Sequence, residues 1–426
     1  MIIRNRPIDM KRQTSGALSS IQQRKSPTRS VSSNWQNLLS VLLIFTVVCG
    51  APGASQAEPQ KTTTASNNHL GYEAFTTDFF KRRQPELNFK ASSKEAALAW
   101  QRKLRPRLAT LVGAFPKQAC PLNSRVFDTK QLTTRAADGR TVKYQRQTII
   151  FSSRPKMDVI AYFLMPLADG AASANPLACI VCPTGHSMMP KNPSNLDELV
   201  GINSATGKPR SAKEGYQKDL ALQCVENGYC ALAVEQLAFG KRREPKDEKD
   251  NQVNACGIPS RIALLGGETL LGWRVYDLMR AIDYLSTRKE VDSKRIACMG
   301  VSHGGTISLY AAALDPRIKC AVISCVLNTF AEEMLGHYHC ICIYVPQMHL
   351  VCDLPDVAGL IAPRFAFFES AAKDVDCPIK GARDAFKVVR RIYDVLGVPS
   401  HTEMTEFDKE HEFDGREAFR FLRKNL

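Results

Sequence analysis

The chain has 426 residues, of which 44% are apolar and 23% charged; this is typical of a globular protein and excludes a wholly disordered chain. Its formal charge of +15 falls to +9 (50 basic and 41 acidic residues) once residues 1–57 are left out. The remaining basic residues are dispersed among acidic ones, as in 240–250, so we expect a solvated surface and no nucleic-acid partner.

The N-terminal segment has the pattern of a signal peptide. Residues 1–34 carry seven basic residues and one acidic residue, and the apolar run Leu38–Gly50 is too short to span a membrane comfortably. Small residues follow, and Ala57 lies where a signal peptidase would cut. We therefore expect residues 1–57 to be removed, leaving a periplasmic or extracellular protein without stable membrane insertion. An uncleaved anchor or a lipid on Cys49 is the alternative.

The next two segments predict an arm followed by a helix. Residues 58–88 are polar and indicate a flexible linker, so we expect ordered structure to begin after them, with a helical extension over about 89–117. Ser92 and Glu95 form a capping-box pattern at the start of this helix. Pro106 should bend or divide it.

Periodicity along the rest of the chain predicts one α/β domain over residues 89–426. Between 126 and 167 apolar and polar residues alternate, which favours consecutive antiparallel strands. From residue 177 onward, short apolar runs alternate with helical patterns, which is typical of a mostly parallel sheet with helices on both faces. Many of the thirteen cysteines after the signal segment lie in strand-like runs, where cysteine behaves as a small buried hydrophobe, and their pairing stays open.

A Gly-x-Ser-x-Gly pattern, formed by Gly300, Ser302 and Gly304, lies between an apolar run and a helical pattern. The pattern alone is common by chance, but a sharp strand-to-helix turn would project the serine hydroxyl from the edge of the sheet. The two glycines would supply the space that such a turn needs. The context therefore indicates Ser302 as a nucleophile, with the backbone N–H of His303 as one donor to an oxyanion.

A serine nucleophile needs a histidine base held by a carboxylate, in the chain order serine, acid, histidine. Asp374 follows one late strand-like run and His411 follows the next, so both would lie in loops at the ends of strands. Asp376 is the nearest rival for the acid. Glu369 is a weaker rival because it lies within the strand itself.

The second oxyanion donor is expected in the loop after the apolar run 177–182. Gly185 permits close approach of the backbone there, and the N–H of His186 or Ser187 is the expected donor. Metal binding by the His186 side chain is an alternative to this interpretation.

A second group of residues carries zinc-type ligands. His337, His339, Cys340 and Cys342 lie within six residues of one another. This spacing is tighter than that of ordinary structural zinc sites, and the nearest paired cysteines lie in a strand, at 179–182. We therefore expect no metal here and interpret the segment as a half-buried loop that caps the top of the sheet.

Several linked segments resemble the α/β-hydrolase superfamily, specifically its dienelactone-hydrolase-like and acetyl-xylan-esterase-like bacterial branch. The resemblance covers roughly Ser92–Leu426 and implies an α/β-hydrolase fold with Ser302 as nucleophile, Asp374 as acid and His411 as base. The chain departs from its relatives after Asp374, where they tend to have a proline, and this keeps Asp376 open as the acid. The segments that carry the resemblance are VEQLAFGKRRE, LLGWRVYDLMRAIDYLSTRKEVDSKRIACMGVSHGGT, HCICIYVP, LIAPRF, AAKDVDCPI and DKEHEF.

The resemblance implies a serine esterase that works through an acyl-enzyme and needs no metal or organic cofactor, and the signal-peptide pattern indicates that it is exported. True dienelactone hydrolases use a cysteine nucleophile, so Ser302 indicates ordinary ester hydrolysis. The expected substrate is a small ester, above all an acetylated saccharide. A serine peptidase of the same superfamily and a non-catalytic binding protein that keeps the fold are the alternatives. No oligomeric state is predicted.

Overall fold

The computed structural model describes residues 71–113, 115–168, 170–186, 195–203, 206–210, 215–249, 255–335 and 339–426. The predicted signal peptide and the first part of the predicted arm, residues 58–70, lie outside these ranges. Within the described ranges, no helix combines the length and the apolar character needed to cross a membrane.

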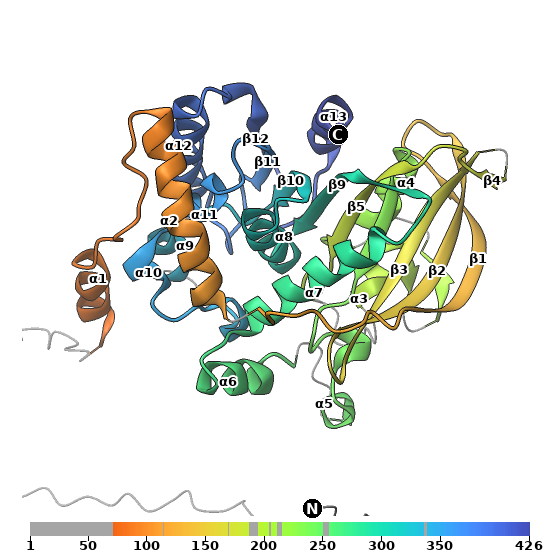
Figure 1. Ribbon diagram of the computed structural model, residues 1–426, viewed down its shortest axis with the longest axis horizontal. Helices are drawn as coiled ribbons and strands as arrows, with labels where there is room; N and C mark the ends of the chain where they lie inside the picture. The colour runs from red at the N-terminus through yellow and green to blue at the C-terminus, as the bar shows by residue number, and fades with distance from the viewer. Residues whose placement is uncertain are drawn as a thin grey trace, which may run out of the picture. The chain divides into compact units, whose positions relative to one another are not determined.

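One large mixed β-sheet runs through the described part of the chain (Figure 1). Its strand order is β1-β2-β3-β8-β5-β9-β10-β11-β12, and β4 pairs with β3. The pairs from β1 to β8 along this order are antiparallel, and the pairs from β8 to β12 are parallel. The predicted fold class, a mostly parallel sheet with antiparallel N-terminal strands, is therefore confirmed.

The central parallel strands are buried on both faces, which explains why their sequences are mostly apolar. β1 is largely exposed, and β2 alternates in burial. The strands of the large sheet are β1 (Arg125–Arg135), β2 (Thr141–Arg154), β3 (Met157–Ala168), β4 (Ala171–Ala172), β5 (Leu177–Pro183), β8 (Cys230–Val234), β9 (Val291–Val301), β10 (Ile318–Ser324), β11 (Phe365–Ala371) and β12 (Thr402–Phe407). A separate short hairpin consists of β6 (Ile202–Asn203) and β7 (Lys208–Pro209).

Helices cover both faces of the sheet. Apolar side chains of α2, α7, α8, α11 and α12 form the larger core with one face, and those of α3, α4 and α13 form a second core with the other. The α-helices are α1 (Glu73–Lys81), α2 (Lys94–Val112), α3 (Asn195–Leu199), α4 (Leu220–Glu226), α5 (Pro245–Lys249), α6 (Gly257–Leu265), α7 (Leu270–Leu285), α8 (His303–Leu314), α9 (Phe330–Met334), α10 (Met348–Val351), α11 (Leu354–Gly359), α12 (Ile379–Val395) and α13 (Arg416–Asn425). Short 3₁₀ helices lie at η1 (Gly240–Arg242), η2 (Ile341–Ile343) and η3 (Pro399–His401).

Helix α2 differs from its prediction in two respects. Its N-cap is Ser93, whose hydroxyl accepts a hydrogen bond from the N–H of Ala96 at 3.2 Å, and not Ser92. The helix also continues through Pro106 as far as Val112 instead of dividing. Its apolar face is fully buried against the rest of the core, and this packing outweighs the hydrogen bond that proline removes.

Helix α1 lies within the segment that was expected to be a flexible linker, so regular structure begins earlier than predicted. The ring of Phe80 in this helix stacks on His349, with ring centroids 3.6 Å apart. His349 Nε2 also lies 3.3 Å from the backbone oxygen of Phe80. Through these contacts α1 packs against a distant part of the chain.

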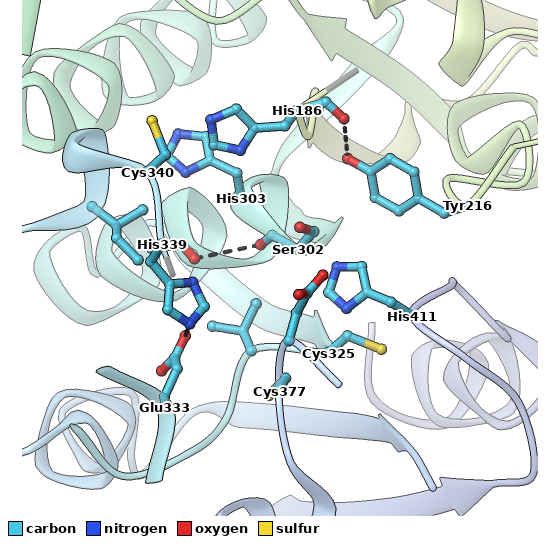
Figure 2. Close-up of a pocket in the computed structure, with 14 residues that line it drawn as sticks. His186, Tyr216, Ser302, His303, Cys325, Glu333, His339, Cys340, Cys377 and His411 are labelled. Atoms are coloured by element: carbon cyan, nitrogen blue, oxygen red, sulfur yellow. Dashed lines mark hydrogen bonds and ion pairs between the residues drawn. The ribbon is translucent and has the colours of Figure 1, made fainter. Parts of the chain in front are cut away.

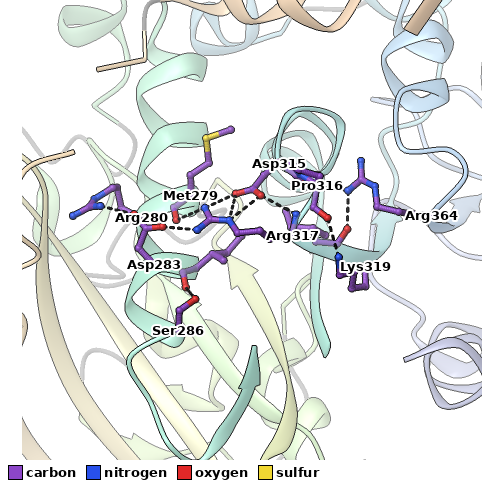
Figure 3. Close-up of polar contacts among 11 residues, drawn as sticks. Met279, Arg280, Asp283, Ser286, Asp315, Pro316, Arg317, Lys319 and Arg364 are labelled. Carbon is purple, nitrogen blue, oxygen red and sulfur yellow. Dashed lines mark hydrogen bonds and ion pairs between the residues drawn. The ribbon is translucent and has the colours of Figure 1, made fainter. Parts of the chain in front are cut away.

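A polar network joins α7, the end of α8 and the start of β10 (Figure 3). The Arg317 guanidinium contacts both carboxylate oxygens of Asp315 and also pairs with Asp283 of α7. Arg364, which precedes β11, donates to the backbone oxygen of Ile318 at 2.7 Å. The network lies where β10 begins, so it fixes the end of the sheet opposite to the carboxyl ends of the parallel strands.

The carboxyl ends of the parallel strands meet at one edge of the sheet, where the loops of such folds hold ligands. The loops after β5, β9, β11 and β12 contain His186, Ser302, Asp374 and His411, respectively. The topology therefore gathers at one edge the four segments that the sequence singled out.

Candidate active site

Ser302 occupies a sharp turn between β9, which ends at Val301, and α8, which begins at His303. Its backbone has φ 57° and ψ −132°, a conformation that L-residues rarely adopt and that costs energy. The N–H of Ser302 donates to the oxygen of Ser324 at the end of β10, at 3.0 Å, which anchors the turn to the sheet. The side chain lines a pocket and lies at the N-terminus of a buried helix, where the helix dipole favours negative charge.

Two glycines make this turn possible because backbone passes too close for a side chain. A Cβ on Gly300 would lie 2.4 Å from the carbonyl atoms of Gly304. A Cβ on Gly304 would lie 2.4 Å from the oxygen of Pro183 at the end of β5. Both glycines therefore serve close packing of β9, α8 and β5 around Ser302, as the motif predicted.

We expect Gly304→Ala to lower the free energy of unfolding by about 1–3 kcal/mol, because a clash with backbone cannot be relieved by a change of rotamer. The higher helix propensity of alanine, about 1 kcal/mol, offsets only part of the loss. Urea denaturation measures the change. Gly71→Ala is the control, since no described atom lies within 4 Å of the added Cβ, and its effect should stay within about 0.5 kcal/mol. Equal stability of the two variants would contradict the steric argument.

Asp374 and His411 are in direct contact. Nδ1 of His411 lies 2.7 Å from Oδ2 of Asp374, whose side chain is fully buried. The other oxygen, Oδ1, accepts the N–H groups of Asp376 and Cys377, each at 2.9 Å. The Asp376 side chain is exposed at the pocket rim. The structure thus brings Asp374, and not its rival, to Nδ1 of the histidine, and Nε2 of His411 has no hydrogen-bond partner among the described residues.

Glu369, the weaker rival, has another environment. It is fully buried in β11, and its carboxylate accepts the hydroxyl of Ser324 at 2.7 Å. It also accepts the N–H groups of Asp414 and Gly415, at 3.0 and 3.1 Å, in the loop that carries His411. Burial raises the pKa of Glu369 to about 7, although these three donors oppose the increase. Glu369 therefore holds the His411 loop and does not contact the imidazole.

The residues predicted to form the oxyanion hole lie on two sides of Ser302. His303 is the first residue of α8, so its N–H has no partner within the helix. The N–H of Gly185 is occupied by Oε1 of Gln217 at 2.7 Å, and a Cβ on Gly185 would overlap the Tyr216 hydroxyl. His186 lines the same pocket as Ser302, whereas Ser187 lies outside the described residues.

The environment of the His303 side chain does not suit a catalytic base. It is 3% exposed, and its Nε2 lies 2.6 Å from Nη1 of Arg274. Burial, followed by the charge of Arg274, holds the pKa of His303 well below its usual range. The imidazole is therefore neutral and its Nε2 accepts a hydrogen bond from the Arg274 guanidinium, which leaves the backbone N–H as the group of His303 that is available to the site.

A pocket of about 300 Å³ contains Ser302 and His411 together (Figure 2). Tyr216 lies beside them and donates its hydroxyl to the oxygen of His186 at 2.6 Å. On the opposite wall, Glu333 faces His339 with a separation of 3.9 Å. Burial raises the pKa of Glu333 to about 8, and the nearby carboxylates of Asp353 and Asp374 add to this increase. One pocket thus holds the Ser302 hydroxyl, the His411 imidazole that contacts Asp374, and the Glu333 carboxyl with its raised pKa.

The model of the family described as the Abhydrolase family matches residues 60–425. The chain belongs to this family. The resemblance to an α/β-hydrolase, esterase-like family that the sequence carries is therefore confirmed.

Known proteins similar to this Abhydrolase family member include "Putative hydrolase YtaP" of Bacillus subtilis (strain 168), 28% identical over 209 residues, 47% of this chain and 66% of YtaP. "Acetyl esterase Axe7A" of Xylanibacter ruminicola is 42% identical over 60 residues, 14% of this chain and 13% of that protein. Among solved structures, a "putative acetyl xylan esterase" from Bacteroides fragilis NCTC 9343 has a TM-score of 0.64 at 19% identity, covering 83% of this chain and 89% of that one. The chain thus spans just under two thirds of YtaP, and the structural likeness establishes the fold.

Sequence reasoning missed several residues of this Abhydrolase family site. Tyr216 and Glu333 lie far from any motif, and only the fold brings them to Ser302. Of the four residues with zinc-type side chains, His337 lies outside the described residues and His339 faces Glu333. Cys340 and Cys342 instead approach other residues, considered below.

Proposed function

We propose that the protein is an exported serine hydrolase that cleaves carboxylic esters by a Ser302–His411–Asp374 acyl-enzyme mechanism. The observation that carries this proposal is the 2.7 Å contact between His411 and buried Asp374 in the pocket that holds Ser302 at a strained turn. Export rests on the signal-peptide pattern of residues 1–57.

The proposed cycle assigns one step to each group. His411 Nε2 takes the proton of Ser302 as the hydroxyl attacks the ester carbonyl, while Asp374 stabilises the imidazolium through Nδ1. The backbone N–H of His303 and one from His186 or Ser187 bind the oxyanion, next to the N-terminus of α8. His411 then protonates the leaving alcohol and activates the water that releases the acid. No step requires a metal or organic cofactor.

Two observations support a small acyl group, such as acetyl, on a carbohydrate. The pocket of about 300 Å³ lies at the lower end of the range for ligand pockets. The similar proteins include an acetyl esterase and a protein described as a "putative acetyl xylan esterase", and structures with the same fold include "Glucuronoyl Esterase from Solibacter usitatus".

A panel of esters tests this proposal with the purified protein. We expect hydrolysis of p-nitrophenyl acetate, with kcat/KM falling as the acyl chain lengthens to octanoate, because the pocket leaves little room for a long chain. Acetylated xylo-oligosaccharides should lose acetate, whereas the methyl ester of glucuronic acid should be the poorer substrate. A preference for octanoate, or cleavage of the glucuronate ester alone, would contradict the proposed acyl specificity.

A further inference from the structure

Four potential metal ligands from three separate segments converge beside the active-site pocket. They are His186 after β5, Cys256 before α6, and Cys340 and Cys342 at η2. Their ligand atoms all lie within 4.8 Å of one another. Cys256 and Cys342 are 1% exposed, and His186 and Cys340 are half-buried. Figure 2 shows His186 and Cys340, which also line the pocket.

The measured separations match those of a tetrahedral zinc site. Nε2 of His186 lies 3.6 Å from Sγ of Cys256 and 3.5 Å from Sγ of Cys342. With Zn–S bonds of about 2.3 Å and Zn–N bonds of about 2.0–2.1 Å, tetrahedral geometry places sulfur and nitrogen ligands about 3.5–3.6 Å apart. Three cysteines and one histidine are also an ordinary ligand set for structural zinc. The separations of His186 from Cys256 and Cys342 therefore suit a shared metal ion, and Cys340 has its sulfur within 4.8 Å of the other three ligand atoms.

The positive charge beside the cluster favours the thiolate forms of the cysteines, and therefore an anionic zinc–thiolate complex, as well. Arg274 is 1% exposed and donates to Sγ of Cys256 at 3.4 Å. It also contacts the oxygen of Leu237 and Nε2 of His303, neither of which is a carboxylate. Zinc with three thiolates and a neutral histidine carries a formal charge of −1, and the guanidinium would balance it. Buried charges in proteins are paired in this way.

We propose that His186, Cys256, Cys340 and Cys342 bind a structural zinc ion that ties the loops around the pocket together. The three thiols release their protons on binding, and with four protein ligands the ion has no open position for substrate. The ion would fix the loop of His186, the proposed source of an oxyanion donor. That last effect rests on the proposed function, whereas the metal site does not. The proposal replaces the expectation that this region binds no metal.

The metal content of the purified protein, produced with added zinc and freed of loose metal by gel filtration, tests the proposal. Inductively coupled plasma mass spectrometry should find roughly one zinc ion per chain. Cys256→Ser and Cys342→Ser should lose it. Cys120→Ser, which removes a half-buried thiol outside the cluster, should keep it. Circular dichroism reports whether each variant is folded.

Two further measurements use protein in which all four proposed ligands are present. Cobalt(II) in place of zinc should give thiolate-to-cobalt charge-transfer and intense visible absorption, as expected for a tetrahedral site with sulfur ligands. Arg274→Gln keeps all four ligands but removes the balancing charge, so competition with a chelator should show zinc affinity lowered roughly 10- to 100-fold.

Three results would overturn the proposal: wild-type protein without zinc, a Cys342→Ser variant that retains it, or a native disulfide between two of the three cysteines. A different metal in stoichiometric amount would overturn the choice of zinc. All are read from metal content and thiol state. They are therefore independent of whether Ser302 labels with an ester analogue or hydrolyses an ester.

Discussion

Ser302→Ala should lower kcat for p-nitrophenyl acetate by roughly 10⁴-fold or more, since loss of a serine nucleophile removes the acyl-enzyme route and leaves only oxyanion stabilisation and binding. The fold should persist, because alanine keeps the Cβ of the strained residue at φ 57° and the backbone contact with Ser324. Steady-state kinetics and thermal unfolding measure the two effects.

Ser308→Ala is the matched control for this variant. Ser308 lies on the same helix, α8, is fully buried, and does not line the pocket that holds Ser302. Its removal should leave kcat nearly unchanged. A fluorophosphonate probe should label the wild-type protein at Ser302 and leave Ser302→Ala unlabelled. Equal kcat in wild type and Ser302→Ala, or a label on another serine, would refute the proposed mechanism.

The fold was largely predictable because burial leaves a local signature in the sequence. Strands covered on both faces, such as β5 and β11, are mostly apolar, whereas burial alternates along β2 in the antiparallel part of the sheet. Helix α1 was not predictable in this way. Its order depends on the stacking of Phe80 on His349, which lies 269 residues further along the chain, and local composition carries no trace of that contact.

The same division applies to the candidate site. Gly300 and Gly304 mark the turn because their steric requirement is local, and the order of acid and histidine follows from the strands that precede them. The cluster of potential metal ligands beside the pocket could not be predicted from the sequence, because Cys342 and His186 are 156 residues apart. Cys256 also lies outside the two segments, around His186 and around Cys342, that the sequence analysis considered. Spacing along the chain tests only ligands that are close in sequence.

Asp374 and Asp376 could not be separated from the sequence because both lie in the loop after β11, two residues apart, and side-chain direction depends on the loop's turn. The structure predicts a sharp difference between them. Asp374→Asn should lower kcat roughly 10⁴-fold, since an amide at the position of Oδ2 would donate to Nδ1 of His411 and place the ring proton on Nε2, which then cannot act as the base.

Asp376→Asn should leave kcat nearly unchanged, because the Asp376 side chain is exposed and its contribution to the triad is the backbone N–H that Oδ1 of Asp374 accepts. Asparagine keeps this N–H. The pair of variants also separates catalysis from folding: in Asp374→Asn the amide oxygen can still accept both loop N–H groups, so the unfolding temperature of this variant should stay close to that of the wild type. Loss of activity in Asp376→Asn with activity retained in Asp374→Asn would transfer the role of the acid to Asp376.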